Sequence, residues 1–157
     1  MEGIGQYKNI TPELEQIQDS GSSSLFVACY QDRYFDRSWH HHPEYELLLI
    51  THGFGQRFVG DHSEQFKEGD LVLMGPRLPH AWISDPVFRE PSSAKIFRSV
   101  SIQFKASLFD SCFEHLNELG GVLKLLQRSK RGLKVTGSLK DSIFGSISEL
   151  PDLGPLE

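Results

Sequence analysis

The chain has 157 residues and a mass of 17.8 kDa, which suits a single compact domain. Its 38% hydrophobic and 24% charged residues exclude a disordered chain, and no apolar stretch approaches the length of a membrane-spanning helix. The net charge of −5 comes entirely from residues 1–104, because residues 105–157 hold equal numbers of acidic and basic side chains. A basic surface for nucleic acid is therefore not expected on this chain.

Short strands are predicted to follow a loose lead-in. Residues 1–24 hold few apolar side chains, and we expect only a short helix there, after Thr11 and Pro12. From Leu25 onward, runs rich in β-branched, aromatic and leucine residues alternate with turn residues. Six runs are predicted as strands: 25–30, 44–50, 53–59, 71–74, 80–83 and 96–104. Their spacing predicts an antiparallel sandwich or barrel over residues 25–104.

The apolar spacing changes to a helical period after Phe104. Residues 108–119 are predicted to form an amphipathic helix that ends at Gly120 and Gly121. A short helix over residues 122–128 and a third helix from Ser138 to the residue before Pro151 are expected next. Residues 105–157 are thus predicted to be a helical segment packed on or beside the barrel.

A histidine-rich string carries the strongest chemical signal. His40 and His42 are two residues apart and Glu46 has the same parity, so on an extended chain all three point to one side. Two imidazoles and a carboxylate suit a divalent transition metal such as Zn, Ni, Fe or Mn. His80, at the start of a predicted strand, is the candidate fourth ligand. The alternative is a metal-free set of hydrogen-bonded residues that lines a ligand pocket.

The spacing around these residues resembles the two motifs of the cupin superfamily. Six residues separate Glu46 from Gly53, and ten residues separate Gly69 from His80. This resemblance implies a small β-barrel in which the metal ligands are His40, His42, Glu46 and His80. The turn positions depart from the family pattern of glycine, proline, glycine and asparagine, since the residues found there are Tyr34, Gly75, Arg77 and Ser84.

A longer set of strings resembles the N-terminal sensor domain of AraC-type transcription regulators over roughly residues 25–150. The strings are Ser38–Leu47, Arg57–Asp61, Gly69–Pro76, Leu78–Trp82, Ile102–Phe104 and Arg131–Leu133. The resemblance implies a cupin-like barrel (a double-stranded β-helix or jelly roll) that binds a small effector, and a helical segment that forms a homodimer. It also implies a C-terminal DNA-binding domain, which we expect to be absent from this chain.

Four residues are predicted to contact the effector. Trp82 shares the parity of His80, and the planar fork of Arg57 suits an anionic or hydroxylated ligand unless it is simply a surface arginine. Trp39 offers an aromatic face on which sugars or aromatic metabolites stack, unless it simply fills the core of the barrel. Glu44 is a second carboxylate at the mouth of the site or a solvated residue. The remaining histidines are expected at the surface: His41, His52, His62 and His115.

The sequence therefore predicts the sensor domain of an AraC-type regulator that binds a sugar or another small metabolite. Only two cysteines occur, Cys29 and Cys112, which is too few for a disulfide framework and favours the cytoplasm. We expect a homodimer formed through the C-terminal helices, no membrane contact, and DNA contact only through the absent domain. The alternative is a stand-alone metal-dependent cupin enzyme of the dioxygenase or isomerase type. No separate general base or nucleophile pair stands out to support it.

Overall fold

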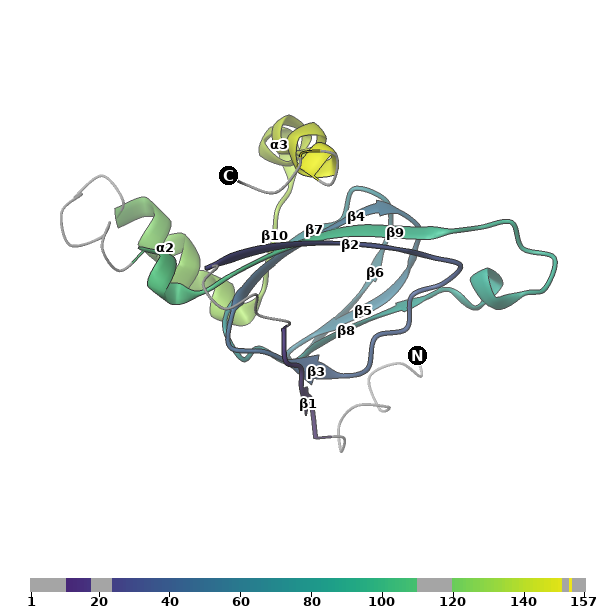
Figure 1. Cartoon of the computed structure of the whole chain (residues 1–157), viewed down its shortest axis with the longest axis horizontal. Coiled ribbons are helices and arrows are strands. Elements are labelled where there is room, and N and C mark those ends of the chain that lie inside the picture. Colours follow the sequence, from purple (N-terminus) through teal and green to yellow (C-terminus); the bar gives the residue numbers. More distant parts are fainter. Residues whose placement is uncertain (1–10, 18–23, 110–119, 151–152, 154–157) are drawn as a thin grey trace.

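The computed structural model describes residues 11–17, 24–109, 120–150 and 153. Over these residues the chain forms two sheets that face each other, with helices at one end and on one face (Figure 1). Sheet A has the order β1 (Glu13–Leu14), β3 (His40–His41), β8 (His80–Ser84), β5 (Gly55–Val59), β6 (His62–Phe66). Sheet B has the order β10 (Leu133–Lys134), β7 (Leu71–Met74), β4 (Tyr45–His52), β9 (Phe97–Phe104), β2 (Leu25–Asp32). The prediction of a mainly β barrel followed by helices is confirmed.

All six predicted strands are present, and the structure adds four short ones. Strand β6 was not predicted from the sequence because its residues are mostly polar. It pairs with β5 across a two-residue turn at Gly60 and Asp61. Gly60 has a φ of 58°, which favours glycine at such a turn. The helix expected after Pro12 is wrong, because Glu13–Leu14 form β1 and pair in parallel with β3.

The apolar core lies between the inner faces of the two sheets. The Phe35 and Phe97 rings stack with centroids 4.6 Å apart, and Phe66 meets Phe97 edge to face. Alternation along β4 sends Leu48 and Ile50 into this core, where both are buried. The core fills one end of the space between the sheets and leaves the other end to polar residues.

The helical part is attached to sheet B in two ways. Helix α2 (Gly120–Arg128) leads through the 3-10 turns η4 (Ser129–Arg131) to β10, and Gly75 donates its N–H to the Ser129 carbonyl at 2.8 Å. Helix α3 (Gly137–Glu149) lies on the outer face of sheet B (Figure 1), where Ile147 packs on a buried apolar cluster. Two further 3-10 turns are η1 (Pro86–Arg89) and η2 (Ala106–Phe109).

Two helix predictions differ from the structure or go beyond it. Gly120 and Gly121, which were predicted to end a helix, are instead helical and belong to α2. The predicted helix over residues 108–119 lies mostly outside the described residues. Among the described residues, no helix combines the length and apolar character needed to cross a bilayer.

The attachment of α3 gives a testable prediction. Ile147→Ala removes a side chain that is only 7% exposed and belongs to a buried cluster with Leu49, Leu71 and Val100, so we expect a loss of about 2–5 kcal/mol of unfolding free energy. Leu139→Ala on the same helix is the control, because Leu139 is 61% exposed and should change stability by less than about 0.5 kcal/mol. Urea unfolding followed by tryptophan fluorescence measures both. Equal effects would contradict the described packing of α3.

Candidate functional site

Three histidines and a glutamate meet inside the barrel. The potential ligand atoms of His40, His42 and His80 all lie within 4.8 Å of one another, and all three residues are buried. Glu46 Oε2 lies 3.0 Å from His42 Nε2 and 3.2 Å from His80 Nε2. Glu46 Oε1 also accepts a hydrogen bond of 2.6 Å from the Ser101 hydroxyl. The structure therefore brings together all four residues predicted as metal ligands.

The reason for their convergence differs from the one given by strand parity. His40 belongs to β3 in sheet A and Glu46 to β4 in sheet B, so the chain crosses from one sheet to the other between them. His80 lies directly opposite His40 in the neighbouring strand β8. The histidines consequently face the carboxylate across the barrel interior, instead of sharing one face of a single strand. The Pro43 region forms this crossing.

The histidine rings are oriented as metal-ligating imidazoles usually are. His40 Nδ1 donates to the Ser38 carbonyl and His80 Nδ1 donates to the Leu78 carbonyl, both at 2.7 Å. Each contact fixes the proton on Nδ1 and leaves Nε2 directed at the cluster. His80 Nε2 is buried, and its contact with Glu46 lacks hydrogen-bond geometry. The donor set is therefore three imidazoles and a carboxylate, and one imidazole nitrogen is buried without a hydrogen bond. Such a set fits a divalent transition metal.

Two further carboxylates flank the cluster. Glu15 Oε2, from the segment after β1, lies 3.1 Å from His40 Nε2, and its other oxygen bonds Arg37. Glu44 Oε2 lies 3.6 Å from His42 Nδ1, and Glu44 is buried, so the expectation that it is solvated is wrong. Neither Glu44 Oε2 nor His42 Nδ1 forms a hydrogen bond within the described part of the chain. The site thus holds more acidic groups than the sequence motif suggested.

The electrostatics of the site favour ionised carboxylates and a cationic His40. The hydrogen bond from His40 is the main reason that the pKa of Glu15 falls to about 2. Burial alone would lower the pKa of His40, but its hydrogen bonds to Glu15 and the Ser38 carbonyl raise it overall. Burial likewise acts to raise the pKa of Glu46, and His42 and His80 together hold it well below the usual value. The site therefore attracts positive charge.

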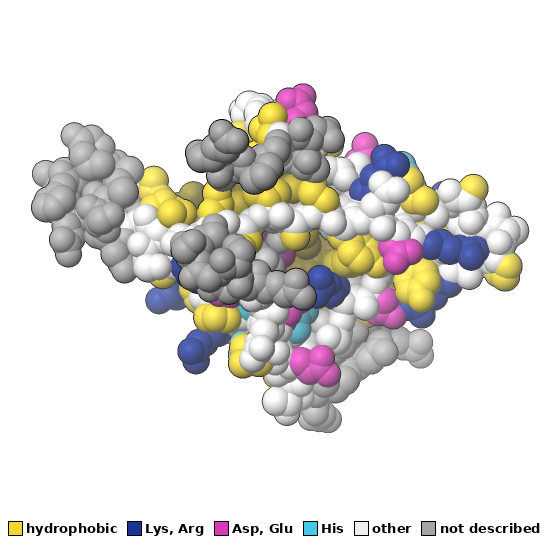
Figure 2. All heavy atoms as spheres, viewed as in Figure 1, with side chains coloured by type: hydrophobic (Ala, Val, Ile, Leu, Met, Phe, Trp, Pro, Cys, Tyr) yellow, Lys and Arg dark blue, Asp and Glu magenta, His cyan; other side chains and the backbone are white. Residues whose placement is uncertain are grey.

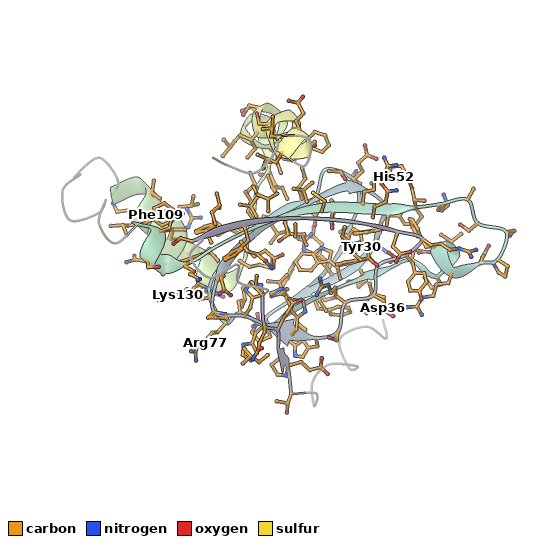
Figure 3. All side chains as sticks on the ribbon, in the orientation of Figure 1. Tyr30, Asp36, His52, Arg77, Phe109 and Lys130 are labelled. Carbon is orange, nitrogen blue, oxygen red and sulfur yellow. The ribbon has the colours of Figure 1, made fainter. Side chains whose placement is uncertain are left out.

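A tight turn supports the cluster from outside. Arg77 donates its N–H to the His42 carbonyl at 2.7 Å, three residues before His80. Its φ of 60° is left-handed, a conformation that costs a non-glycine residue roughly 1–2 kcal/mol. The cupin pattern has glycine at this position. Arg77 therefore replaces that glycine but keeps the left-handed backbone conformation that glycine adopts easily. Figure 3 shows Arg77 at this lower end of the barrel, close to β3.

A cavity of about 440 Å³ opens beside the cluster, between the two sheets. Tyr30, Phe35, Leu48 and Trp82 form its apolar wall, and in Figure 3 Tyr30 lies between the sheets. Inward residues of β9 form its polar wall: Ser99, Ser101 and Gln103. His40, His80 and Glu46 close one end, together with Glu15 and Arg37. Figure 2 shows hydrophobic side chains along this opening, with histidine and charged side chains at its lower edge.

The predicted effector contacts divide between this cavity and other places. Trp82 lines the cavity, and its buried indole Nε1 has no hydrogen-bond partner among the described residues. Trp39 does not join it. As the neighbour of His40, Trp39 points to the opposite face of sheet A and packs against Phe58 and Ala81. Glu44 lines a smaller pocket of about 280 Å³ beside Pro43.

Arg57 is buried, but its guanidinium is already paired. It points inward beside Trp82 and bonds both Asp70 and Glu64. Lys134 of β10 bonds Glu64 at 2.6 Å and lies 3.8 Å from Asp70. Burial raises the pKa of Asp70 more than Arg57 lowers it. Arg57 is thus neither a surface arginine nor part of the cavity wall, and it ties sheet A to the edge of sheet B.

The other histidines lie apart from the cluster. His52 and His62 are exposed as expected, and Figure 3 shows His52 at the far end of β4. His41 is partly buried, so the expectation that it is exposed is wrong: its neighbour on β1 is Leu14. His115 lies outside the described residues.

Sequence reasoning missed Glu15 and the polar wall of the cavity. Glu15 carries no sequence signal, because its position depends on a two-residue parallel pairing between β1 and β3. Ser99, Ser101 and Gln103 alternate with Val100 and Ile102 along β9. This alternation was a usable signal, since the polar side of a buried strand points to a cavity or to solvent.

Comparison with known proteins supports the same architecture. The AraC-like ligand binding domain family matches residues 20–142. Crystal structures of ToxT from Vibrio cholerae are similar in fold, one at 13% identity over 86% of this chain and 50% of that chain, with a TM-score of 0.57. Another, with unsaturated fatty acid bound, has 16% identity over 80% and 46% of the two chains and a TM-score of 0.53. The chain therefore spans about half the length of these proteins. No protein of curated function matches significantly.

The pairing of Arg57 gives a prediction that separates a structural role from ligand binding. Arg57→Leu leaves Asp70 buried without its main partner, so we expect a loss of about 3–5 kcal/mol in stability. Arg89→Leu is the control, because its ion pair with Asp36 is half-exposed and should contribute less than about 1 kcal/mol. Urea unfolding at pH 7 measures both. A loss below about 1 kcal/mol for Arg57→Leu would show that the buried pair is not structural.

Proposed function

The chain belongs to the AraC-like ligand-binding domain family, and we propose that it binds its effector in the 440 Å³ cavity between the sheets. The resemblance predicted from the sequence is confirmed, and with it the general function of an effector-binding regulatory domain. The observation that carries the proposal is the cavity itself. Its volume lies in the range of small-molecule sites, and its walls combine an apolar side with a few polar groups.

The lining favours a small amphipathic effector with hydrogen-bond acceptors. The aromatic and aliphatic wall suits a ring or a short hydrocarbon, and the hydroxyls of Ser99 and Ser101 with the Gln103 amide suit a hydroxylated or carbonyl group. The unpartnered Trp82 N–H is a donor that a bound ligand can satisfy. Sugars, phenolic compounds and short organic acids meet these requirements. Fatty acids join the candidates because one similar ToxT structure holds an unsaturated fatty acid.

A divalent transition metal is the second part of the proposal. His40, His42, His80 and Glu46 would hold it, and Zn, Ni, Fe or Mn all accept such a donor set. The support comes from the ring orientations and from the buried His80 Nε2 described above. When bound, the metal supplies a Lewis acid at the end of the cavity, where an oxygen of the effector could reach it. His40 and His80 also line the cavity, so the metal and effector would be neighbours.

The domain would act in the cytoplasm as the sensor of a transcription regulator. On this proposal the helical segment after residue 105 forms a homodimer, and DNA is bound by a separate domain of the regulator. The acidic excess of residues 1–104 supports the view that the barrel itself does not contact DNA. Effector binding would shift the packing of the helices only if the two packings differ in affinity for the effector.

A metal-dependent enzyme is the second candidate, and the donor set of three histidines and a glutamate is the observation that favours it. The two proposals differ in what happens to the ligand. A sensor binds the effector reversibly and returns it unchanged, whereas an enzyme consumes it. Mass spectrometry of the ligand after incubation with the metal-loaded chain distinguishes them.

Ligand binding at the cavity is tested by thermal melting against a panel of sugars, phenolics, amino acids and fatty acids. A ligand at 100 times its Kd stabilises the fold by about 2.7 kcal/mol, a Tm shift of roughly 5–10 °C for a domain of this size. Trp82→Phe should weaken binding and reduce the shift, because it removes the cavity N–H. Trp39→Phe, on the outer face, should leave the shift unchanged. The effector proposal fails if no compound raises the Tm of the wild type.

Metal binding is tested separately by elemental analysis of the purified chain. His42→Ala and His80→Ala should each abolish most of the bound metal, because each removes one of three buried imidazoles. His62→Ala is the matched control, since His62 is exposed and outside the cluster. Unchanged metal content in the two cluster variants would contradict the assignment of these ligands.

A further inference from the structure

The N-terminal segment, residues 11–17, is held on the barrel by few contacts. Strand β1 pairs with β3 over only two residues, with backbone hydrogen bonds of 2.9 Å from Glu13 N to the Trp39 carbonyl and from Glu15 N to the His41 carbonyl. A two-residue pairing is marginal by itself. The same segment nevertheless forms part of the cavity wall through residues 15–17. Side-chain contacts add to this backbone pairing, since Glu13 accepts a hydrogen bond from Ser38 and Glu15 bonds Arg37.

Glu15 also connects this segment to the histidine cluster. Its Oε2 lies 3.1 Å from His40 Nε2, on the side of the ring that faces the histidine cluster. Because the Nδ1 proton of His40 is committed to the Ser38 carbonyl, a neutral His40 would present a lone pair at Nε2 to the carboxylate. Two such acceptors can lie this close only with a cation between them, which is either a proton or a metal ion. A metal ion would bind both atoms at once.

The charge of the site points the same way. Glu46 alone leaves a divalent metal with a net charge of +1 in a buried environment, where uncompensated charge is costly. Glu15 adds a second carboxylate to the site, which it shares with the half-exposed Arg37, and it raises the protein donors to five. Zn can expand to five donors, and Fe, Mn and Ni are accommodated by mixed imidazole and carboxylate sets. The other nearby carboxylate, Glu44, contacts the Nδ1 side of His42 at 3.6 Å and does not face this position.

We propose that Glu15 is an additional ligand of the barrel metal, and that metal binding fastens the N-terminal segment onto the barrel beside the cavity. This inference rests on the metal part of the proposed function. It adds that the N-terminal segment is loosely held without metal and ordered with it. An effector would then meet a complete cavity wall at residues 15–17 only in the metal-loaded domain.

Hydrogen exchange with and without zinc tests this on the whole chain. The chain is freed of metal with a chelator and titrated with Zn²⁺, while mass spectrometry follows exchange of the backbone amides of residues 11–17. In the wild type, Zn²⁺ should slow exchange there by on the order of tenfold. In Glu15→Gln, Zn²⁺ should still bind through the histidines with on the order of tenfold lower affinity, and exchange of the segment should not respond.

Glu13→Gln is the matched control. It lies on the same short strand and accepts a hydrogen bond from Ser38 at 3.1 Å, but it does not contact the cluster, so it should behave as wild type. If Glu15→Gln matches the wild type in both zinc affinity and zinc-dependent protection, the inference about Glu15 is wrong while the metal site stands. If the wild type itself takes up no metal, the inference fails together with the proposed metal. Melting curves of the chelated proteins check that Glu15→Gln is folded.

Discussion

The carboxylate of Glu46 is a buried negative charge in the middle of the barrel, and its compensation determines how the two sheets are joined. It lies on β4, near the centre of sheet B, and reaches His42 and His80 on the side of sheet A. A buried charge without partners is costly, so the imidazoles and the Ser101 hydroxyl are needed to keep it ionised. The polar contact therefore holds the two inner faces together at one end, as the stacked rings of Phe35 and Phe97 do at the other.

This division gives the interior a polarity gradient. Aromatic and aliphatic side chains fill the space at one end, and the histidine cluster lies at the other. The cavity lies between them. Residues of the core form its apolar wall, and residues of β9 form its polar wall. A ligand that fits must have an apolar part for one wall and a polar part for the other. The structure therefore favours an amphipathic effector over a purely apolar or a highly charged one.

Strand parity predicted the inner residues well and failed where the chain changes sheets. Trp82 and His80 share a face of β8 as expected, because β8 is a regular strand paired on both sides. Glu46 was assigned to the same face as His40 and His42, but it reaches them from the opposite sheet, since a local pattern cannot reveal a crossing between sheets. Trp39 was expected in the pocket on its aromatic character alone, although its parity is opposite to that of His40 and places it on the outer face of sheet A.

The residues that the sequence could not reveal depend on long-range pairing. Glu15 reaches His40 through two residues of parallel strand, and the partners of Arg57 come from β6 and from the residue before β7. Neither arrangement leaves a periodic signal. The barrel as a whole was predictable because six strands have the right length and spacing, and because the inward and outward alternation of each strand is local.

The same alternation connects the cavity with the helical segment. On β4, Glu46 and Leu48 face the cavity while Leu47 and Leu49 contact the apolar cluster under α3. On β9, Ser99 and Ser101 face inward while Val100 and Ile102 face α3. A ligand that displaces either strand from the cavity side therefore also displaces the outer surface on which α3 packs. Close-packed interfaces respond to such shifts by changing from one arrangement to another. A ligand that fills the cavity without moving β4 or β9 would bind without changing how α3 is held.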